Sequence, residues 1–274
     1  MKKKWYQITL NLKDFDPLEI ESVFLDQGSI SISYSDKQDT PIYEPAPGET
    51  PFWENTLITA LFNDPPELEQ ISDALTHKLK LKKPPYLYYK TLTDRKWELE
   101  WKKNFSSMQF GEKLWVIPFD QSAPEGENVI IRINPGLAFG SGTHATTTLC
   151  LNWLDKINIK GKNFYDFGCG SGILSIAALK LGASKVVACD IDPQAIQSSK
   201  KNAIANDVGE KLILRNEINN VDGPYDIIIA NILSNTLIEN VEIICQNLRP
   251  GGKLGMSGIL SNQIESVINI YSKY

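Results

Sequence analysis

The stretch that most constrains the fold is YDFGCGSGILSIAALKLGASKVVACDID, which runs from Tyr165 to Asp192. It begins as an apolar strand, passes through closely spaced glycines, continues as a helix-forming segment and ends in a second apolar strand followed by acids. A strand, a glycine turn and a helix form the unit with which parallel sheets bind nucleotide-like cofactors. The stretch therefore predicts an α/β domain with a cofactor at its glycine turn.

The sequence around this stretch repeats the same alternation of strands and helices. A helix is expected from Ala145, with Leu149, Trp153 and Ile157 on one face. The other expected elements are strands KLWVIPF, NVIIRINP, NFYDF, KVVACD, KLILRNE, YDIIIAN and KLGMSGIL, helices ILSIAALKL, PQAIQSSKKNAIAN, TLIENVEIICQNL and SNQIESVINIYSKY, and a turn at RPGG. Continuously apolar strands separated by helices indicate a mostly parallel sheet covered on both faces.

The first third of the chain has a different pattern. A strand over Trp5–Leu12 is followed by a helix with Asp16 as cap and Pro17 at its first position. Two strands (SISISY and NTLITALF), a helix (PPELEQISDALTHKL) and a last strand (YLYYKTL) complete the order βαββαβ, a ferredoxin-like α+β arrangement. Residues 1–93 carry 10 Lys and no Arg against 14 Asp plus Glu. This acidic balance favours a basic protein over RNA as partner.

Three domains follow from these patterns. Residues 1–93 are expected to form a small ferredoxin-like domain. Residues 94–110 are expected to form a helical linker, because Trp97 and Trp101 are spaced to share one helix face. Residues 111–274 are expected to form the cofactor-binding domain.

Composition excludes several other classes. The four cysteines form no CxxC pair and no metal-ligand spacing, so we expect reduced thiols in a cytoplasmic protein and no metal site. The start of the chain lacks the apolar core of a signal peptide, and the apolar run YDIIIANIL is too short to cross a membrane. The formal net charge of −5 disfavours a nucleic-acid clamp, and no direct DNA contact and no membrane partner are expected. A monomer is the simplest expectation.

The glycine spacing distinguishes between cofactors. Gly168, Gly170 and Gly172 read GxGxG, whereas a dinucleotide fingerprint would need its third glycine at Ile173. A carboxylate, Asp166, opens the turn, where it would repel a pyrophosphate but suit a ligand with an ammonium and a sulfonium. Asp190 ends the next strand, where a ribose diol is bound. The pattern predicts S-adenosylmethionine and therefore a methyltransferase.

Asn231 ends the apolar strand YDIIIAN and is the candidate catalytic residue. In an open parallel sheet, ligands bind in the crevice at the carboxyl ends of the strands. The side-chain carbonyl of Asn231 could accept hydrogen bonds from an amine awaiting methylation, although the residue could also simply end the strand. Ile232 and Leu233 follow it in place of a Pro-Pro-aromatic motif, which disfavours a nucleobase and allows an alkyl amine.

The segments NPGLAFGSGTHATTTLCLNWLD, DFGCGSGILSIAALKLGA and ANIL resemble the bacterial methyltransferases of ribosomal protein L11 over nearly the whole chain. The resemblance implies a class I methyltransferase domain joined through a helical linker to a small ferredoxin-like domain. It implies substrate recognition by residues 1–93 and methylation, up to trimethylation, of lysines and the α-amine of that basic ribosomal protein. It also implies cofactor contacts for Thr147, Gly168, Asp190 and Asn231. Asp166, Gly170 and Thr146 are further candidates for cofactor contacts. Physically, Thr143, Thr146 and Thr147 could equally cap the following helix. His144 is expected to be a positioning or packing group and not a catalytic base.

One departure from this family concerns the end of the sheet. A class I sheet normally continues with two further strands after SNQIESVINIYSKY, so the last strands are expected to be missing. The fifth strand is then expected to be an exposed apolar edge.

Three other functions remain to be compared. An rRNA methyltransferase should carry a basic, aromatic-rich appendage, and the acidic first third disfavours one. A ribosome-binding module with a degenerate catalytic core is disfavoured by the intact Asp166, Asp190 and glycines. A dehydrogenase is disfavoured by the missing third glycine.

Overall fold

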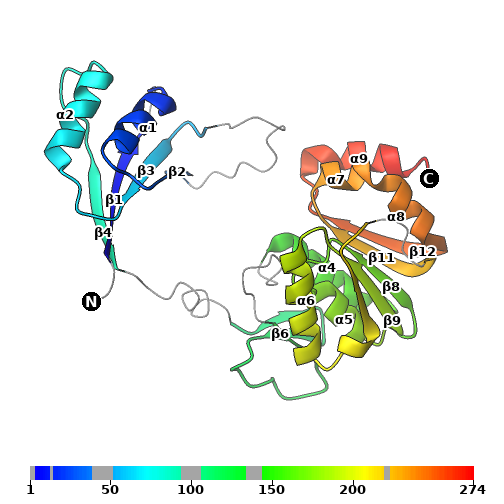
Figure 1. Ribbon diagram of the computed structural model, residues 1–274. Helices are drawn as coiled ribbons and strands as arrows, with labels where there is room; N and C mark the ends of the chain where they lie inside the picture. The colour runs from blue at the N-terminus through cyan, green and yellow to red at the C-terminus, as the bar shows by residue number, and fades with distance from the viewer. Residues whose placement is uncertain (1–3, 13–14, 39–51, 94–105, 134–143, 219–222) are drawn as a thin grey trace. The chain divides into compact units, whose positions relative to one another are not determined.

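The computed structural model describes residues 4–12, 15–38, 52–93, 106–133, 144–218 and 223–274 (Figure 1). The chain divides into two compact units, Met1–Trp97 and Glu98–Tyr274. The predicted linker helix falls mostly on residues 94–105, outside the described residues. Its last predicted residues differ from the expectation, because Met108–Phe110 form a strand.

The first unit has the predicted order βαββαβ. Its elements are β1 (Lys4–Asn11), α1 (Pro17–Asp26), β2 (Ser31–Asp36), β3 (Thr56–Phe62), α2 (Leu68–Lys78) and β4 (Tyr88–Thr93). The strands form an antiparallel sheet in the order β2-β3-β1-β4, which confirms the ferredoxin-like arrangement. Helix α1 begins as predicted, because the Asp16 carboxylate accepts a 2.9 Å hydrogen bond from the backbone N–H of Leu18.

The two faces of this sheet differ in character. Ile8, Leu10, Ile58 and Ala60 are buried in a core that includes residues of α1 and α2, so both helices cover the same face. Because side chains alternate along a strand, Thr9 points to the opposite face. There its hydroxyl lies 2.9 Å from that of Thr59.

The second unit is built on a five-stranded parallel sheet in the order β10-β9-β8-β11-β12, which confirms the predicted α/β class. Its strands are β8 (Asn163–Phe167), β9 (Lys185–Cys189), β10 (Leu212–Arg215), β11 (Tyr225–Asn231) and β12 (Leu248–Ser257). Its helices are α4 (Ala145–Lys156), α5 (Ile173–Lys180), α6 (Pro193–Ala205), α7 (Ser234–Glu239), α8 (Val241–Asn247) and α9 (Ile264–Tyr271), with short 3₁₀ turns at Gly209–Lys211 and Ser261–Gln263. Within the described chain, β12 pairs with β11 alone and forms one edge of the sheet.

Helices cover both faces of this sheet (Figure 1). Alternate residues of β8 point to opposite sides: Phe164 packs with residues of α4, α5 and α6, whereas Tyr165 and Phe167 pack with residues of α7, α8 and α9. A smaller sheet, β5 (Met108–Phe110), β6 (Leu114–Ile117) and β7 (Val129–Arg132), adds to the first of these layers.

Three details of the second unit differ from the predictions. On the predicted face of α4, Trp153 and Ile157 pack against the core but Leu149 is exposed, and the buried face is formed by Thr147, Cys150, Leu151 and Leu154. The helix expected over TLIENVEIICQNL is interrupted at Asn240 and forms α7 and α8. β12 begins before the predicted strand, at Leu248, and the RPGG residues lie within it, where the pairing with β11 shifts from Leu248 to Lys253.

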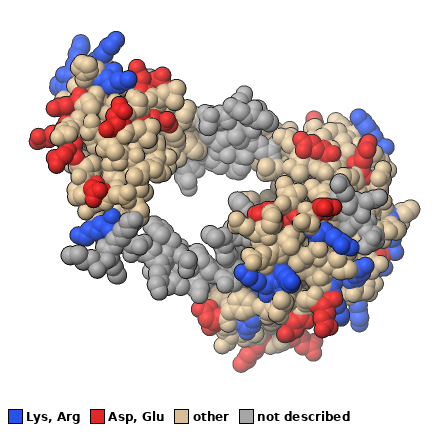
Figure 2. Space-filling model, in the orientation of Figure 1, with Lys and Arg blue, Asp and Glu red and all other residues tan. Residues whose placement is uncertain are grey.

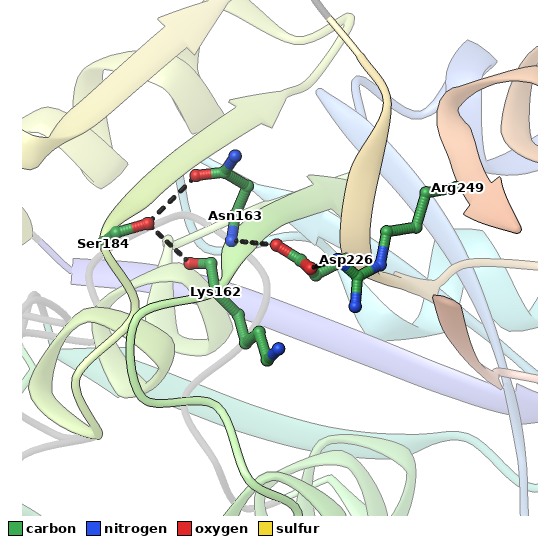
Figure 3. A network of polar contacts seen from close by, with 5 residues as sticks. All are labelled: Lys162, Asn163, Ser184, Asp226 and Arg249. Atoms are coloured by element: carbon green, nitrogen blue, oxygen red, sulfur yellow. Dashed lines mark hydrogen bonds and ion pairs between the residues drawn. The ribbon is translucent and has the colours of Figure 1, made fainter. Parts of the chain in front are cut away.

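A polar network fixes the amino ends of the central strands (Figure 3). The backbone N–H of Asn163 donates to Oδ2 of Asp226 at 2.7 Å, and Arg249 forms an ion pair with the same carboxylate. The Ser184 hydroxyl lies 3.0 Å from the carbonyl oxygen of Lys162 and 2.9 Å from Oδ1 of Asn163. The network holds β8, β9, β11 and β12 in register at the edge opposite the predicted cofactor crevice.

Candidate active site

The strand order places the crevice between two neighbouring strands. From β8 the chain runs outward to β9 and β10 on one side, and later returns to add β11 and β12 on the other. Such a reversal opens a crevice at the carboxyl ends of the strands that flank it. The glycine loop follows β8 and Asn231 ends β11, so both predicted features lie at this reversal.

The glycine loop has a backbone that only glycine adopts readily. Gly168, Gly170 and Gly172 have φ of +82°, +53° and +78°, in the left-handed region. The third of them also lies against α6, because a Cβ on Gly172 would lie 2.8 Å from Oγ of Ser199. The loop is therefore shaped for close approach of a helix on one side and of a ligand on the other.

Asp190 ties this loop to the second strand. Its Oδ2 accepts a 2.8 Å hydrogen bond from the backbone N–H of Gly170, and its Oδ1 accepts a 3.0 Å bond from that of Asp192. An ionised carboxylate has about four acceptor positions, so both oxygens can accept further bonds. The residue is partly exposed and can offer them to a diol.

Asp166 is enclosed behind the loop. Its carboxyl group is fully buried, and Oδ2 accepts a 2.6 Å hydrogen bond from the Ser175 hydroxyl. Oδ1 has no hydrogen-bond partner among the described residues. Burial raises the pKa of Asp166, two hydrogen bonds from Ser175 lower it and the nearby Asp190 raises it, with a net value of about 7. Its charge state therefore responds to any cation that arrives nearby.

Two residues that support the loop were not anticipated from the sequence. Ser199 donates from its hydroxyl to the carbonyl oxygen of Gly170 at 2.8 Å, and Asn202 donates from Nδ2 to that of Ser171 at 2.9 Å. Both are buried on α6, one helical turn apart. The available signal was a pair of polar residues on the helix face that packs against the loop.

Asn231 and Thr147 meet across the crevice. Nδ2 of Asn231 lies 3.4 Å from Oγ1 of Thr147, which is buried on the first turns of α4. This contact leaves Oδ1 of Asn231 to face another group, and the side chain is only partly buried. The structure thus brings together two residues that are far apart in sequence and that were both predicted to belong to the site.

The turn after Asn231 is held between two glycines. A Cβ on Gly168 would lie 2.4 Å from Cγ2 of Ile232, and one on Gly258 would lie 2.3 Å from the carbonyl oxygen of Ile232. Gly258 has φ of +87°, so it is also needed for its conformation. Sequence reasoning missed Gly258, because it gave no motif of its own.

The residue that caps the N-terminus of α4 is a histidine and not one of the threonines. His144 is the N-cap: its Nδ1 accepts a 3.4 Å bond from the backbone N–H of Thr146 and lies 2.7 Å from the hydroxyl of the same residue. The carbonyl oxygen of Thr146 accepts a 3.3 Å bond from Ser257 on β12. His144 therefore positions α4, as expected. Thr143 lies outside the described residues.

Apolar side chains border the crevice. Ile191, next to Asp190, is 73% exposed, and Leu233, two residues after Asn231, is 54% exposed. Removing large aliphatic side chains from water is favourable, so a ligand that covered these two would gain binding free energy. They offer an apolar surface beside the polar groups of the site.

Metal and thiol chemistry find no support in the described parts of the chain. No group of three His, Cys, Asp or Glu residues that could hold a metal ion occurs there. All four cysteines are free thiols, and burial raises the pKa of Cys150 to about 12 and also raises that of Cys169. Among the described helices, none combines the length and apolar character needed to cross a bilayer.

The chain resembles proteins of known family. The family model for ribosomal protein L11 methyltransferases matches residues 4–274. The chain is 43% identical to the ribosomal protein L11 methyltransferase of Pasteurella multocida over 270 residues, covering 98% of this chain and 92% of that one. The corresponding protein of Histophilus somni is 45% identical over 97% of this chain and 90% of its own.

A solved structure agrees with this result. The crystal structure of ribosomal protein L11 methylase from Lactobacillus delbrueckii subsp. bulgaricus is 32% identical in sequence. It superposes with a TM-score of 0.57 and covers 62% of this chain and 88% of that chain.

Proposed function

This chain belongs to the ribosomal protein L11 methyltransferase family, and we propose that it transfers methyl groups from S-adenosylmethionine to amines of ribosomal protein L11. The observation that carries the proposal is the convergence of the glycine loop, Asp190 and Asn231 at the carboxyl rim of the parallel sheet. Each amine acceptor is expected to be a lysine side chain or the α-amine, with up to three methyl groups added.

The residues present fit the cofactor. The left-handed glycine loop leaves its backbone open to close approach, and Asp190 keeps acceptor capacity for a ribose diol. The unpartnered, buried Oδ1 of Asp166 supplies negative charge behind the loop, which suits a ligand that carries two positive charges. Ile191 would cover one face of the adenine ring. Thr146 and Thr147 would lie toward the methionine end.

When bound, S-adenosylmethionine supplies a methyl group activated by its sulfonium charge. The protein must then hold a neutral amine about 3 Å from that methyl group and in line with the breaking bond. At pH 7 a lysine of pKa about 10.4 is neutral about 0.04% of the time, which adds about 4.6 kcal/mol to the barrier. An α-amine of pKa about 7.8 adds only about 1 kcal/mol. Burial and a neighbouring positive charge both lower an amine's pKa, so no dedicated base is required.

Asn231 would orient the acceptor. With Nδ2 directed toward Thr147, its Oδ1 can accept a hydrogen bond from the amine N–H and so direct the nitrogen lone pair. Leu233, exposed beside it, would pack against the aliphatic part of a lysine and exclude water.

The first unit would hold the basic substrate through its helices. Exposed carboxylates on or next to α1 and α2 are Asp16, Glu19, Asp26, Glu67, Glu69 and Asp73. A ribosomal protein is rich in positive charge, and a surface of this sign would draw it toward the chain.

The direct experiment supplies radiolabelled S-adenosylmethionine together with purified ribosomal protein L11 or with deproteinised rRNA. The proposal expects label in the protein and in lysine or the α-amine after mass mapping. Label in the rRNA alone would contradict ribosomal protein L11 as the substrate.

A further inference from the structure

The first unit contains a cavity of about 500 Å³ at the end of its sheet where β1 and β2 finish and β3 and β4 begin. Thr9 and Leu57 line it from the sheet face that α1 and α2 leave uncovered, and Leu10 and Phe15 line it from the side of the helices, so it lies at the end of the sheet. Lys37 and Lys83 line it, and none of the described residues around it is acidic. Its size is within the range of sites that bind one nucleotide-sized group.

One wall of the cavity comes from a segment with its own charge pattern. Residues 78–90 have the sequence KLKLKKPPYLYYK, which contains five lysines. No acidic residue occurs between Asp73 and Asp94. Half of the ten lysines in residues 1–93 are therefore gathered here. Figure 2 shows a group of Lys or Arg side chains at the tip of this unit where α2 ends, with carboxylates beside it and a second basic group at the opposite end. The net negative charge of the unit conceals this basic segment.

The same wall carries exposed aromatic rings. Tyr86 is 83% exposed and Tyr88 is 56% exposed, and both line the cavity. Tyr88 pairs with Thr9 and so faces the uncovered side of the sheet, whereas Tyr89 lies on the helix side and stacks on Tyr6 at 6.3 Å between ring centroids. Pro84 and Pro85 precede these rings and restrict the backbone that presents them.

The combination identifies the class of partner. Lysines can neutralise phosphates, and exposed tyrosines can stack on unpaired bases, each stack contributing to binding without sequence preference. In a duplex the bases are paired and stacked on one another, so they are not available to stack on the tyrosine rings. An acidic peptide would satisfy the lysines but would leave the two tyrosine rings without a matching planar group.

We infer that this cavity and its basic, aromatic wall bind single-stranded RNA, with bases on Tyr86 and Tyr88 and phosphates near Lys37 and Lys83. The carboxylates of α1 and α2 are not among the described residues that line the cavity, where the charged side chains are Lys37 and Lys83. The choice of RNA over DNA rests on the proposed function, because a ribosomal protein is bound to RNA in the cell.

The test is fluorescence anisotropy of the full chain with a labelled oligouridine of about ten nucleotides, a length typical of single-strand sites. The double variant Tyr86→Ala/Tyr88→Ala should raise Kd at least tenfold, since each lost stack is worth about fivefold or more. Lys83→Ala should flatten the slope of log K against log salt by about 0.7, the value for one phosphate on a single strand.

Matched variants separate the cavity from general charge. Lys78→Ala removes an exposed lysine of the same segment that does not line the cavity, and Tyr274→Ala removes an exposed tyrosine of the other unit. Both should bind RNA like the parent chain, and circular dichroism should show all variants folded. The inference is overturned if oligouridine does not bind saturably, if the tyrosine pair can be removed without effect, or if oligodeoxythymidine or a poly-glutamate peptide binds more tightly.

This assay contains neither cofactor nor methyl acceptor. Failure to bind RNA would therefore leave the proposed methyl transfer untouched, and failure of methyl transfer would leave the RNA result standing.

Discussion

Nδ2 of Asn231, at the end of β11, lies 3.4 Å from Oγ1 of Thr147, a buried residue of α4. The distance is long for a hydrogen bond, so the contact orients the amide more than it stabilises the fold. The contact uses Nδ2 and leaves the carbonyl oxygen of Asn231 as the acceptor that the proposed function assigns to the amine.

Asn231→Ala should lower turnover more than cofactor affinity. Removing the acceptor for the amine affects the reacting geometry, and a hydrogen bond to a reacting group is worth about tenfold to several hundredfold in rate. We expect kcat to fall by at least about tenfold while the Kd for S-adenosylmethionine changes by less than about threefold. Asn235→Ala, an exposed position on α7, is the control. Unchanged turnover in the Asn231 variant would remove its orienting role.

Thr147→Val should act through Asn231. Valine keeps the shape of threonine but cannot accept the bond from Nδ2, so the amide loses its preferred orientation. In a double-mutant cycle on kcat, the effects of Thr147→Val and Asn231→Ala should be non-additive by about 0.5 kcal/mol or more. Thr147→Ser, which keeps the hydroxyl, should restore most of the rate. Additive effects would show that the two side chains work independently.

Gly258→Ala should damage both stability and turnover. The new methyl group would lie 2.3 Å from the carbonyl oxygen of Ile232, so the turn that carries Asn231 must shift. Thermal unfolding and kcat measure the two effects, and we expect a loss of about 1–3 kcal/mol in stability. Gly251→Ala is the matched control, because Gly251 has a similar φ of +74° but nothing within 4 Å of the added carbon. Equal behaviour of the two variants would assign the damage to backbone strain alone.

Asp166→Asn should remove a pH dependence of stability. The pKa of Asp166 is raised to about 7 in the folded chain, above its value of about 3.9 when unfolded. Between these two values the folded state binds more protons than the unfolded state, so this group's contribution to the unfolding free energy falls as pH rises and is level above about 7. The difference between parent and variant, from denaturant titrations without cofactor, should fall through this window by an amount on the order of a few kcal/mol. Parallel curves would contradict the assigned pKa.

Much of the site could be predicted because it lies where apolar strands end. Gly168, Asp190 and Asn231 each follow or close a run of apolar residues, and the carboxyl ends of parallel strands share one edge of a sheet. The order of elements needed only hydrophobic periodicity and turn residues. The spacing of the glycines favours S-adenosylmethionine over a dinucleotide as the cofactor.

The support behind the site could not be predicted in the same way. Ser199 and Asn202 lie in a helix whose pattern is ordinary, and their importance comes from contacts with a loop distant in sequence. The burial of Leu149 was misjudged because hydrophobic periodicity fits a buried Leu149 as well as a buried Cys150. The contact between Thr147 and Asn231 decides which side of α4 faces the sheet. The basic wall in residues 78–90 was concealed by summing charge over the whole first unit.

Calorimetric titration with S-adenosylmethionine tests the central claim most directly, since the claim is that Asp190 and the glycine loop hold this donor. The parent chain should bind it with one site. Asp190→Ala should weaken binding about tenfold or more, because it removes a charged acceptor for the ribose, whereas Asp192→Ser, which keeps a helix cap, should bind like the parent. No heat with S-adenosylmethionine, together with saturable binding of a nicotinamide dinucleotide, would contradict the account.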